Sequence, residues 1–122
     1  MRRIRSQDMK PEMTVRRLLH RMGYRYRLHK KGLLGKPDIV FGPRKAVIFV
    51  HGCFWHQHDC LDGHRPKSNT GYWDDKLRRN VERDARVQDE LEEMGWRVLV
   101  VWECETKRPE DLEKRLKDFL DP

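Results

Sequence analysis

Two short apolar runs constrain the fold of this chain more than any other feature. "AVIFV" (residues 46–50) and "WRVLVVW" (96–102) are almost entirely apolar, and each predicts a strand that is buried on both faces. The segment between them, from 72 to 94, has apolar residues at helical spacing and is followed by Gly95. Its apolar positions are Trp73, Leu77, Val81, Ala85, Leu91 and Met94. A helix that connects two buried strands indicates a sheet covered by helices.

The segments at both ends of the chain predict two more helices. Pro11 suits the first turn of a helix, and Gly23 offers a left-handed stop. Between them, apolar residues follow at helical spacing: Val15, Leu18, Leu19 and Met22. Residues 109–120 predict a final helix with Leu112, Leu116, Phe119 and Leu120 on one side. We expect one domain over residues 1–122, of the α/β class, with a mixed sheet flanked by helices.

The region before the first buried run predicts a β-hairpin. "YRYRL" (24–28) alternates aromatic and basic residues, as an exposed edge strand does, and "KKGLLGKP" (30–37) has the composition of a loop. "PDIVF" (37–41) predicts a strand, and "GPRK" (42–45) predicts the turn that leads into the strand at 46–50. The two strands are therefore expected to pair antiparallel.

The charge of the chain favours a polyanionic partner. The sequence carries 27 Lys and Arg against 20 Asp and Glu, a net charge of +7, so nucleic acid is the first candidate, although basic residues also serve solubility. No apolar run approaches the roughly 20 residues that span a bilayer. The start "MRRIRSQDMK" lacks the hydrophobic centre of a secretory signal. We expect a cytoplasmic protein, associated with the nucleoid and not with a membrane.

The stretch "HGCFWHQHDC" (51–60) predicts a metal site. A disulfide is disfavoured in the cytoplasm, and three cysteines, Cys53, Cys60 and Cys104, cannot all pair with one another. Three thiolates and one histidine make a complete tetrahedral Zn²⁺ shell, and spacing alone allows either His56 or His58 as the fourth ligand. A closed shell indicates a structural zinc ion. The alternative is three buried cysteines without a metal.

One carboxylate lies on the apolar side of the long helix. Leu77, Asp84 and Leu91 follow one another at intervals of seven, so Asp84 is expected to face inward, and Asn80 shares that face. A buried carboxylate needs a cation, an imidazole or a metal ion as its partner. One of the many arginines is the simplest alternative partner.

A second carboxylate is expected near the same place. Asp38 follows a proline at the start of one hairpin strand, and His51 ends the other, so the hairpin brings both to one edge of the sheet. Carboxylates and imidazoles that meet in this way suit a hard metal ion and an activated water molecule, which together hydrolyse phosphodiesters.

These motifs together resemble a known family. "GKPDIVF", "VIFVHGCFWHQHDC", "NVERD" and "GWRVLVVWEC" are similar to the very-short-patch repair (Vsr) endonucleases, which nick DNA at thymine:guanine mismatches and belong to the PD-(D/E)XK nuclease superfamily. The resemblance runs from about Met1 to Phe119, in the order and spacing of the family. It implies a restriction-endonuclease-like fold with a structural zinc site.

The resemblance also implies catalytic roles. Asp38 would ligate a catalytic Mg²⁺ ion together with the backbone carbonyl of Val50. His56 would be the general base that deprotonates the attacking water, and Asp84 would orient it. His51 would stabilise the scissile phosphate or the leaving group. The usual Glu-x-Lys of the superfamily is replaced by "FVH", as in this family.

Further residues follow from the same resemblance. Glu12 would be an additional acidic residue near the water molecules on the metal. The zinc ligands would be Cys53, His58, Cys60 and Cys104. Phe54 and Trp55 would wedge into the base stack beside the mismatch, where a mismatched step costs less to open than a paired one. The alternative for these two aromatics is core packing.

The remaining contacts with DNA are expected at the N-terminus and on the long helix. Residues 1–10 correspond to the last part of an arm that the family lays across DNA, with Met1 near an apolar wedge position, and Asn80 is a further expected contact. We expect a monomeric Mg²⁺-dependent nicking enzyme for double-stranded DNA with T:G mismatches, with mismatch-repair proteins as candidate partners. The alternatives are a related nuclease with a different or relaxed DNA substrate and a non-catalytic, zinc-stabilised DNA-binding module.

Overall fold

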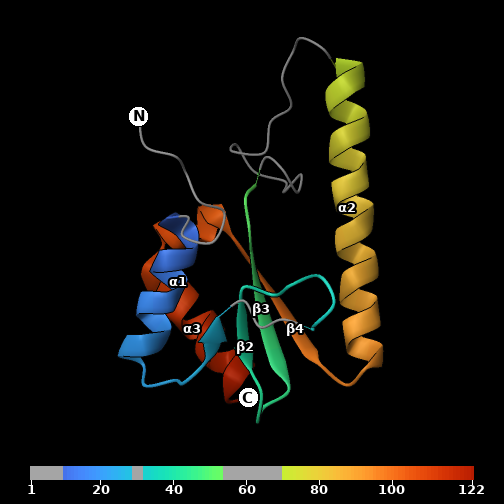
Figure 1. Ribbon diagram of the computed structural model, residues 1–122. Coiled ribbons are helices and arrows are strands. Elements are labelled where there is room, and N and C mark those ends of the chain that lie inside the picture. The colour runs from blue at the N-terminus through green and yellow to red at the C-terminus, as the bar shows by residue number, and fades with distance from the viewer. Residues whose placement is uncertain (1–9, 29–31, 54–69) are drawn as a thin grey trace.

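The computed structural model describes residues 10–28, 32–53 and 70–122, which form helices on both sides of one mixed sheet (Figure 1). The elements in chain order are α1 (Lys10–Arg21), β1 (Arg27–Leu28), β2 (Ile39–Phe41), β3 (Ala46–His51), α2 (Thr70–Glu93), β4 (Arg97–Trp102), the 3-10 helix η2 (Glu103–Lys107) and α3 (Pro109–Leu120). In the described part of the chain, the sheet order is β1-β2-β3-β4. The long helix α2 stands on one side of the sheet, and α1 and α3 stand on the other. The expected α/β class with a mixed, helix-flanked sheet is confirmed.

The hairpin and the crossover pair as the sequence indicates. β2 and β3 are antiparallel, with Ile39 opposite Ile48, and the turn between them is closed by the N–H of Lys45, which donates to the carbonyl of Gly42 at 3.1 Å. After the α2 crossover, β4 pairs with β3 in the parallel direction. The central strand β3 is buried along almost its whole length, because helices cover it on both faces.

Alternation along the strands divides the core into two clusters. One cluster lies between the sheet and the pair α1 and α3, and includes Val15, Leu19, Ile39, Phe41, Ile48, Val101, Leu112 and Leu116. The other lies under α2 and includes Val40, Val47, Phe49 and Leu91. Because successive strand residues point to opposite faces, His51 shares the α2 face with Val47 and Phe49.

The predicted apolar face of α2 is partly wrong. Leu77 and Leu91 are fully buried, but Val81 is 41% exposed, Met94 is 56% exposed and Ala85 is also exposed. The helix touches the sheet through a narrow stripe, and at 100° per residue Val81 lies about 60° away from Asp84 at the centre of that stripe. By contrast, α3 buries Leu112, Leu116 and Leu120 as expected.

The first part of the predicted strand 24–28 does not pair with the sheet. Of these five residues, only Arg27 and Leu28 pair with β2, and the preceding tyrosines contact other groups instead. The rings of Tyr24 and Tyr26 pack edge-on against Phe41, with centroids 6.4 and 6.1 Å away. The Tyr24 hydroxyl donates to Asp121 at 2.5 Å, so this segment is held by its side chains rather than by a strand ladder. None of the described helices is long and apolar enough to cross a membrane.

Candidate active site

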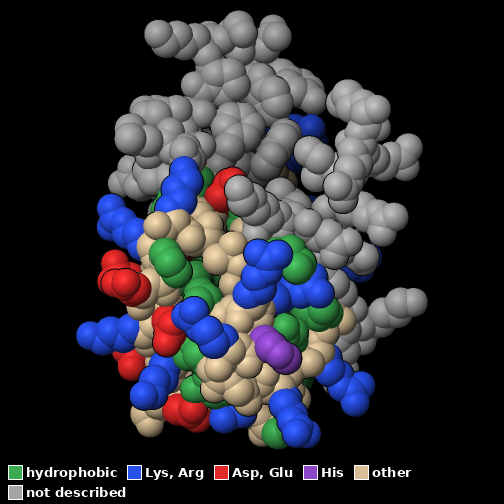
Figure 2. Space-filling model, turned by 90° about the vertical axis from the view of Figure 1, so that its left-hand side faces the viewer, with side chains coloured by type: hydrophobic (Ala, Val, Ile, Leu, Met, Phe, Trp, Pro, Cys, Tyr) green, Lys and Arg blue, Asp and Glu red, His purple; other side chains and the backbone are tan. Residues whose placement is uncertain are grey.

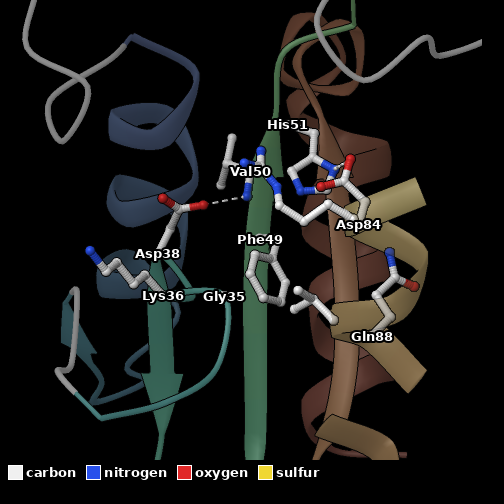
Figure 3. A pocket seen from close by; sticks show the side chains of 10 residues that line it. Gly35, Lys36, Asp38, Phe49, Val50, His51, Asp84 and Gln88 are labelled. Carbon is white, nitrogen blue, oxygen red and sulfur yellow. Dashed lines mark hydrogen bonds and ion pairs between the residues drawn. The ribbon is translucent and has the colours of Figure 1, made fainter. Parts of the chain in front are cut away.

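The ends of β2 and β3 that lie beside α2 open onto a cavity of about 490 Å³ (Figure 3). Four of the predicted site residues line it: Asp38 from the start of β2, Val50 and His51 from the end of β3, and Asp84 from α2. Gly35, Lys36 and Arg83 are among the other lining residues. The expected convergence of the two hairpin ends with the carboxylate of the helix is therefore found in the structure.

Asp38 is held in place by the backbone of the neighbouring strand. Pro37 is buried and restricts the residue before it, and Asp38 itself is half-buried at the mouth of β2. Oδ2 of Asp38 accepts a hydrogen bond from the N–H of Val50 at 2.7 Å (Figure 3). A hydrogen bond to an ionised carboxylate is short and strong, so it fixes the orientation of the carboxylate.

His51 faces the second carboxylate from the end of β3. Its ring lies between Phe49 and Trp102, with centroid distances of 5.8 and 5.4 Å, and the residue is only 7% exposed. Nδ1 of His51 lies 4.0 Å from Oδ2 of Asp84, which is longer than a direct hydrogen bond but within ion-pair range when the ring is protonated. The flanking aromatic rings thus orient the imidazole toward Asp84.

Asp84 lies on the side of α2 that faces the sheet, seven residues from each of the buried Leu77 and Leu91. Its side chain is 18% exposed, and the imidazole of His51 is a partner of the kind that a carboxylate in this position needs. Asn80, one turn earlier, is half-buried, and its Oδ1 accepts from Arg83 at 3.5 Å. The inward placement of Asp84 is confirmed, although the side chain borders a cavity and is not sealed in the core.

The donor set of this cavity fits a magnesium ion. Mg²⁺ prefers oxygen ligands, usually one or two carboxylates together with water and phosphate oxygens. Asp38 supplies a carboxylate with a fixed orientation, and Val50, which also lines the cavity, supplies a backbone carbonyl. His51 and Asp84 line the same cavity, so an imidazole and a second carboxylate lie near these oxygen donors.

Glu12 lies in a different environment. It is 2% exposed in the first turn of α1, and Nη1 of Arg16 is 3.4 Å from its Oε2. It is not among the described residues that line the cavity. Its role near metal-bound water stays a prediction.

The two cysteines of the described part come from corresponding positions of neighbouring strands. Cys53 is fully buried two residues after the end of β3, and Cys104 is half-buried two residues after the end of β4. His51 and Trp102 are register partners in the parallel β3–β4 pair, so both cysteines follow the same end of the sheet. Within the described ranges, no three His, Cys, Asp or Glu side chains form a group that could hold a metal ion.

Several predicted site residues lie outside the described residues. They are Met1, Phe54, Trp55, His56, His58 and Cys60. The wedge, the general base and two of the four zinc ligands therefore stay predictions.

The loop at 32–37 contributes residues that the sequence analysis missed. Gly35 and Lys36 both have positive φ angles, of 74° and 50°. A Cβ atom on Gly35 would lie 2.3 Å from Cγ1 of Val87, so the loop backbone packs directly on α2 beside the cavity. The Gly-Lys-Pro sequence was the available signal, because glycine permits both the left-handed conformation and the close approach.

Comparison with known proteins agrees with this geometry. The family described as DNA mismatch endonuclease Vsr matches residues 1–62. The chain is 52% identical over 122 residues to the type II nicking enzyme V.XorIIP of Xanthomonas oryzae pv. oryzae, covering 100% of this chain and 90% of the relative. It is 41% identical over 125 residues to the DNA mismatch endonuclease Vsr of Escherichia coli, covering 98% of this chain and 80% of the relative.

The fold also resembles a solved structure. The catalytic domain of the homing endonuclease I-Bth0305I superposes with a TM-score of 0.63 at 21% sequence identity, covering 92% of this chain and 94% of that chain. This likeness supports the nuclease fold, and the sequence relatives establish the family. The chain belongs to the Vsr family of DNA mismatch endonucleases.

Proposed function

We propose that this protein is a Mg²⁺-dependent endonuclease that nicks one strand of double-stranded DNA at T:G mismatches. The observation that carries the proposal is the convergence of Asp38, His51 and Asp84 in one cavity. Family membership supports the hydrolysis of DNA, and the name of the E. coli relative supports a mismatch as its target. The nicking enzyme of Xanthomonas supports cleavage of a single strand. Because one strand requires one active site, a monomer is sufficient.

The side chains of the cavity divide the chemistry between them. Asp38 and the carbonyl of Val50 would hold the magnesium ion, which, when bound, would neutralise phosphate charge and lower the pKa of a bound water molecule. An imidazole beside a carboxylate can take up and release a proton near neutral pH, and the carboxylate sets the orientation of the ring. We therefore assign His51 to the scissile phosphate or the leaving group, with Asp84 beside it. His56, which the family resemblance pairs with Asp84, remains our proposed general base, and that pairing stays a prediction because His56 lies outside the described residues.

A structural zinc ion belongs to the same proposal. Cys53 and Cys104 would provide two ligands, and His58 and Cys60 would provide the others. The position of both described cysteines after the same end of neighbouring parallel strands supports this set. A zinc ion there would connect the segment after β3 to η2 and would leave no open coordination position for a substrate.

The proposal is tested by nicking assays on labelled duplexes. Each strand of a T:G duplex and of its matched T:A counterpart is labelled separately and incubated with zinc-loaded protein, with Mg²⁺ or with a chelator. We expect a single cut in the T strand of the mismatched duplex in the presence of Mg²⁺. Zinc-loaded protein that cuts neither duplex would contradict the proposed function.

A matched pair of variants tests the role of the cavity. Asp38→Asn is expected to slow nicking at least about a hundredfold, because it removes the fixed negative charge of the site. Asp118→Asn removes an exposed aspartate from α3, on the other side of the sheet, and is expected to leave the rate unchanged. Equal rates for the two variants would place the chemistry elsewhere.

A second candidate is a nicking enzyme without strict mismatch preference. Several relatives are named type II nicking enzymes, and these names mention no mismatch. Equal nicking of the T:A and T:G duplexes would favour this candidate. The cavity geometry is the same in both cases.

A further inference from the structure

We propose that Lys36 is a phosphate-binding residue of this active site, which contacts the DNA backbone next to Asp38 on the β2 side. The inference rests on the proposed function in one respect, namely that the substrate is DNA. Lys36 lines the cavity and stands two residues before Asp38. In Figure 3, Lys36 lies on one side of Asp38, and His51 and Asp84 lie on the other. A DNA strand that runs from His51 past Asp38 would therefore reach Lys36 next.

The backbone conformation of Lys36 is the first argument. Among the described residues, the non-glycine residues with a positive φ are Lys36, at 50°, and Lys45, at 51°. Lys45 closes the β2–β3 turn, and its ammonium lies 5.6 Å from the centre of the Trp96 ring. A left-handed lysine is less favourable than glycine or asparagine at the same position. Strained residues of this kind concentrate at functional sites, and Lys36 stands at one.

The packing of the loop is the second argument. The close approach of Gly35 to Val87 fixes the loop backbone against α2 immediately before Lys36. The N–H of Lys36 also donates to the carbonyl of Leu33 at 3.2 Å. The base of the lysine side chain is thus anchored to the scaffold that carries Asp84, while Lys36 as a whole is an exposed residue.

The charge of the cavity is the third argument. Two carboxylates, Asp38 and Asp84, would repel a phosphodiester unless cations stand nearby. Among the described residues, the basic side chains that line the cavity are Lys36 and Arg83, and neither forms an ion pair with the described carboxylates. Other basic residues do form such pairs, for example Arg21 with Glu113 and Arg115 with Glu105. Lys36 can therefore bind a phosphate on the side of the cavity formed by β2, and Arg83 lies on the side formed by α2.

The experiment compares two lysines with the same backbone conformation. Lys36→Gly and Lys45→Gly both remove a charge and both relieve a left-handed lysine, but Lys45 lies at the other end of β3. Binding to a T:G duplex is measured over a range of salt concentrations without divalent ions, and nicking is measured separately with Mg²⁺. Thermal melting reports on folding in both variants. Lys36→Arg restores the charge.

The expected results separate a phosphate contact from a structural role. Lys36→Gly should melt no lower than the wild type, bind the duplex about 10- to 100-fold more weakly, and lose about 0.9 from the salt slope, the value of one phosphate contact. Lys36→Arg should retain the slope, and Lys45→Gly should leave the slope and the nicking rate unchanged. An unchanged slope for Lys36→Gly, or an equal loss for Lys45→Gly, would overturn the inference. If the wild type binds DNA but nicks no duplex, the proposed function fails while the slope still tests Lys36.

Discussion

Replacing Gly35 with alanine should detach the Lys36 loop from α2, and the cost can be worked out from two terms. The φ angle of 74° places an alanine in the left-handed region, which costs about 1–2 kcal/mol. Its Cβ would lie 2.3 Å from Cγ1 and 3.3 Å from Cγ2 of Val87, against an ordinary carbon–carbon contact of about 3.5–4.0 Å. Overpacking of this kind costs about 1–3 kcal/mol. The expected loss of unfolding free energy is therefore about 2–5 kcal/mol.

The second term can be isolated because Val87 cannot turn away. Valine in a helix has one strongly preferred rotamer, so its methyl groups stay in the path of the new Cβ. Val87→Ala removes both methyl groups and should restore about 1–3 kcal/mol to the Gly35→Ala protein, which is the coupling expected for residues in contact. Gly32→Ala is the matched control, because its φ angle is 93° and its Cβ would meet no described atom within 4 Å. Gly32→Ala should lose only the roughly 1–2 kcal/mol that the left-handed backbone conformation costs, and adding Val87→Ala should restore none of that free energy.

Urea unfolding of the three single variants and of the two double variants gives these free energies, and the nicking rate reports on the site. Gly35→Ala should lose nicking more than Gly32→Ala does, because it displaces the residue next to Lys36. If the two glycine variants are equally stable, or if Val87→Ala adds its own cost to Gly35→Ala without rescue, the close approach does not anchor the loop.

Three further perturbations test other parts of the molecule. Asp84→Asn should slow nicking about a hundredfold with little change in melting temperature. Asp89→Asn changes an exposed aspartate on the same helix and should leave the nicking rate unchanged. Equal nicking rates for the two variants would refute the role of Asp84 beside His51. The hydrogen bond from Tyr24 holds the pKa of Asp121 below its ordinary value of 3.8, so that contact stabilises the fold fully above pH 3.8 and loses its effect as the pH falls below. Tyr24→Phe should therefore match the wild type more closely in acid than at neutral pH, and a constant gap across a pH series of urea melts would contradict this. Cys104→Ser, or a zinc chelator, should lower the zinc content and the melting temperature together, as measured by elemental analysis and calorimetry, and a zinc-free wild type of full stability would rule out the structural ion.

The local signals of the sequence were sufficient for much of the site. Two short apolar segments and a turn motif predicted that β2 pairs with β3, and this pairing brings Asp38 to the N–H of Val50 and places His51 at the same edge. The seven-residue spacing around Asp84 likewise gave the correct side of α2, because the helical period is independent of tertiary context. Each of these inferences depended only on residues that are close in sequence, at most about four turns of helix apart.

The errors have a common physical origin in contacts between distant segments. The width of the apolar face of α2 depends on how much of the helix touches the sheet, which the sequence of the helix does not contain, and Val81 was therefore misplaced. β1 begins at Arg27 and not at Tyr24, because the side chains of Tyr24 and Tyr26 contact Phe41 and these residues do not pair with β2. The role of Gly35 depends on Val87, far along the chain on another element, so the Gly-Lys-Pro signal marked a turn without indicating its neighbour.

The parallel pairing of β3 with β4 determines when the site can assemble. Each residue of β3 pairs with the residue 51 positions later, such as Ala46 with Arg97, so this pairing has to wait until the whole crossover has been synthesised. Non-local pairing of this kind forms slowly, whereas the β2–β3 hairpin closes locally. During translation, Asp38 and His51 therefore come together before Asp84 is docked beside them. A nascent or truncated chain without α2 would carry Asp38 and His51 without Asp84, and therefore only one side of the cavity that we propose as the active site.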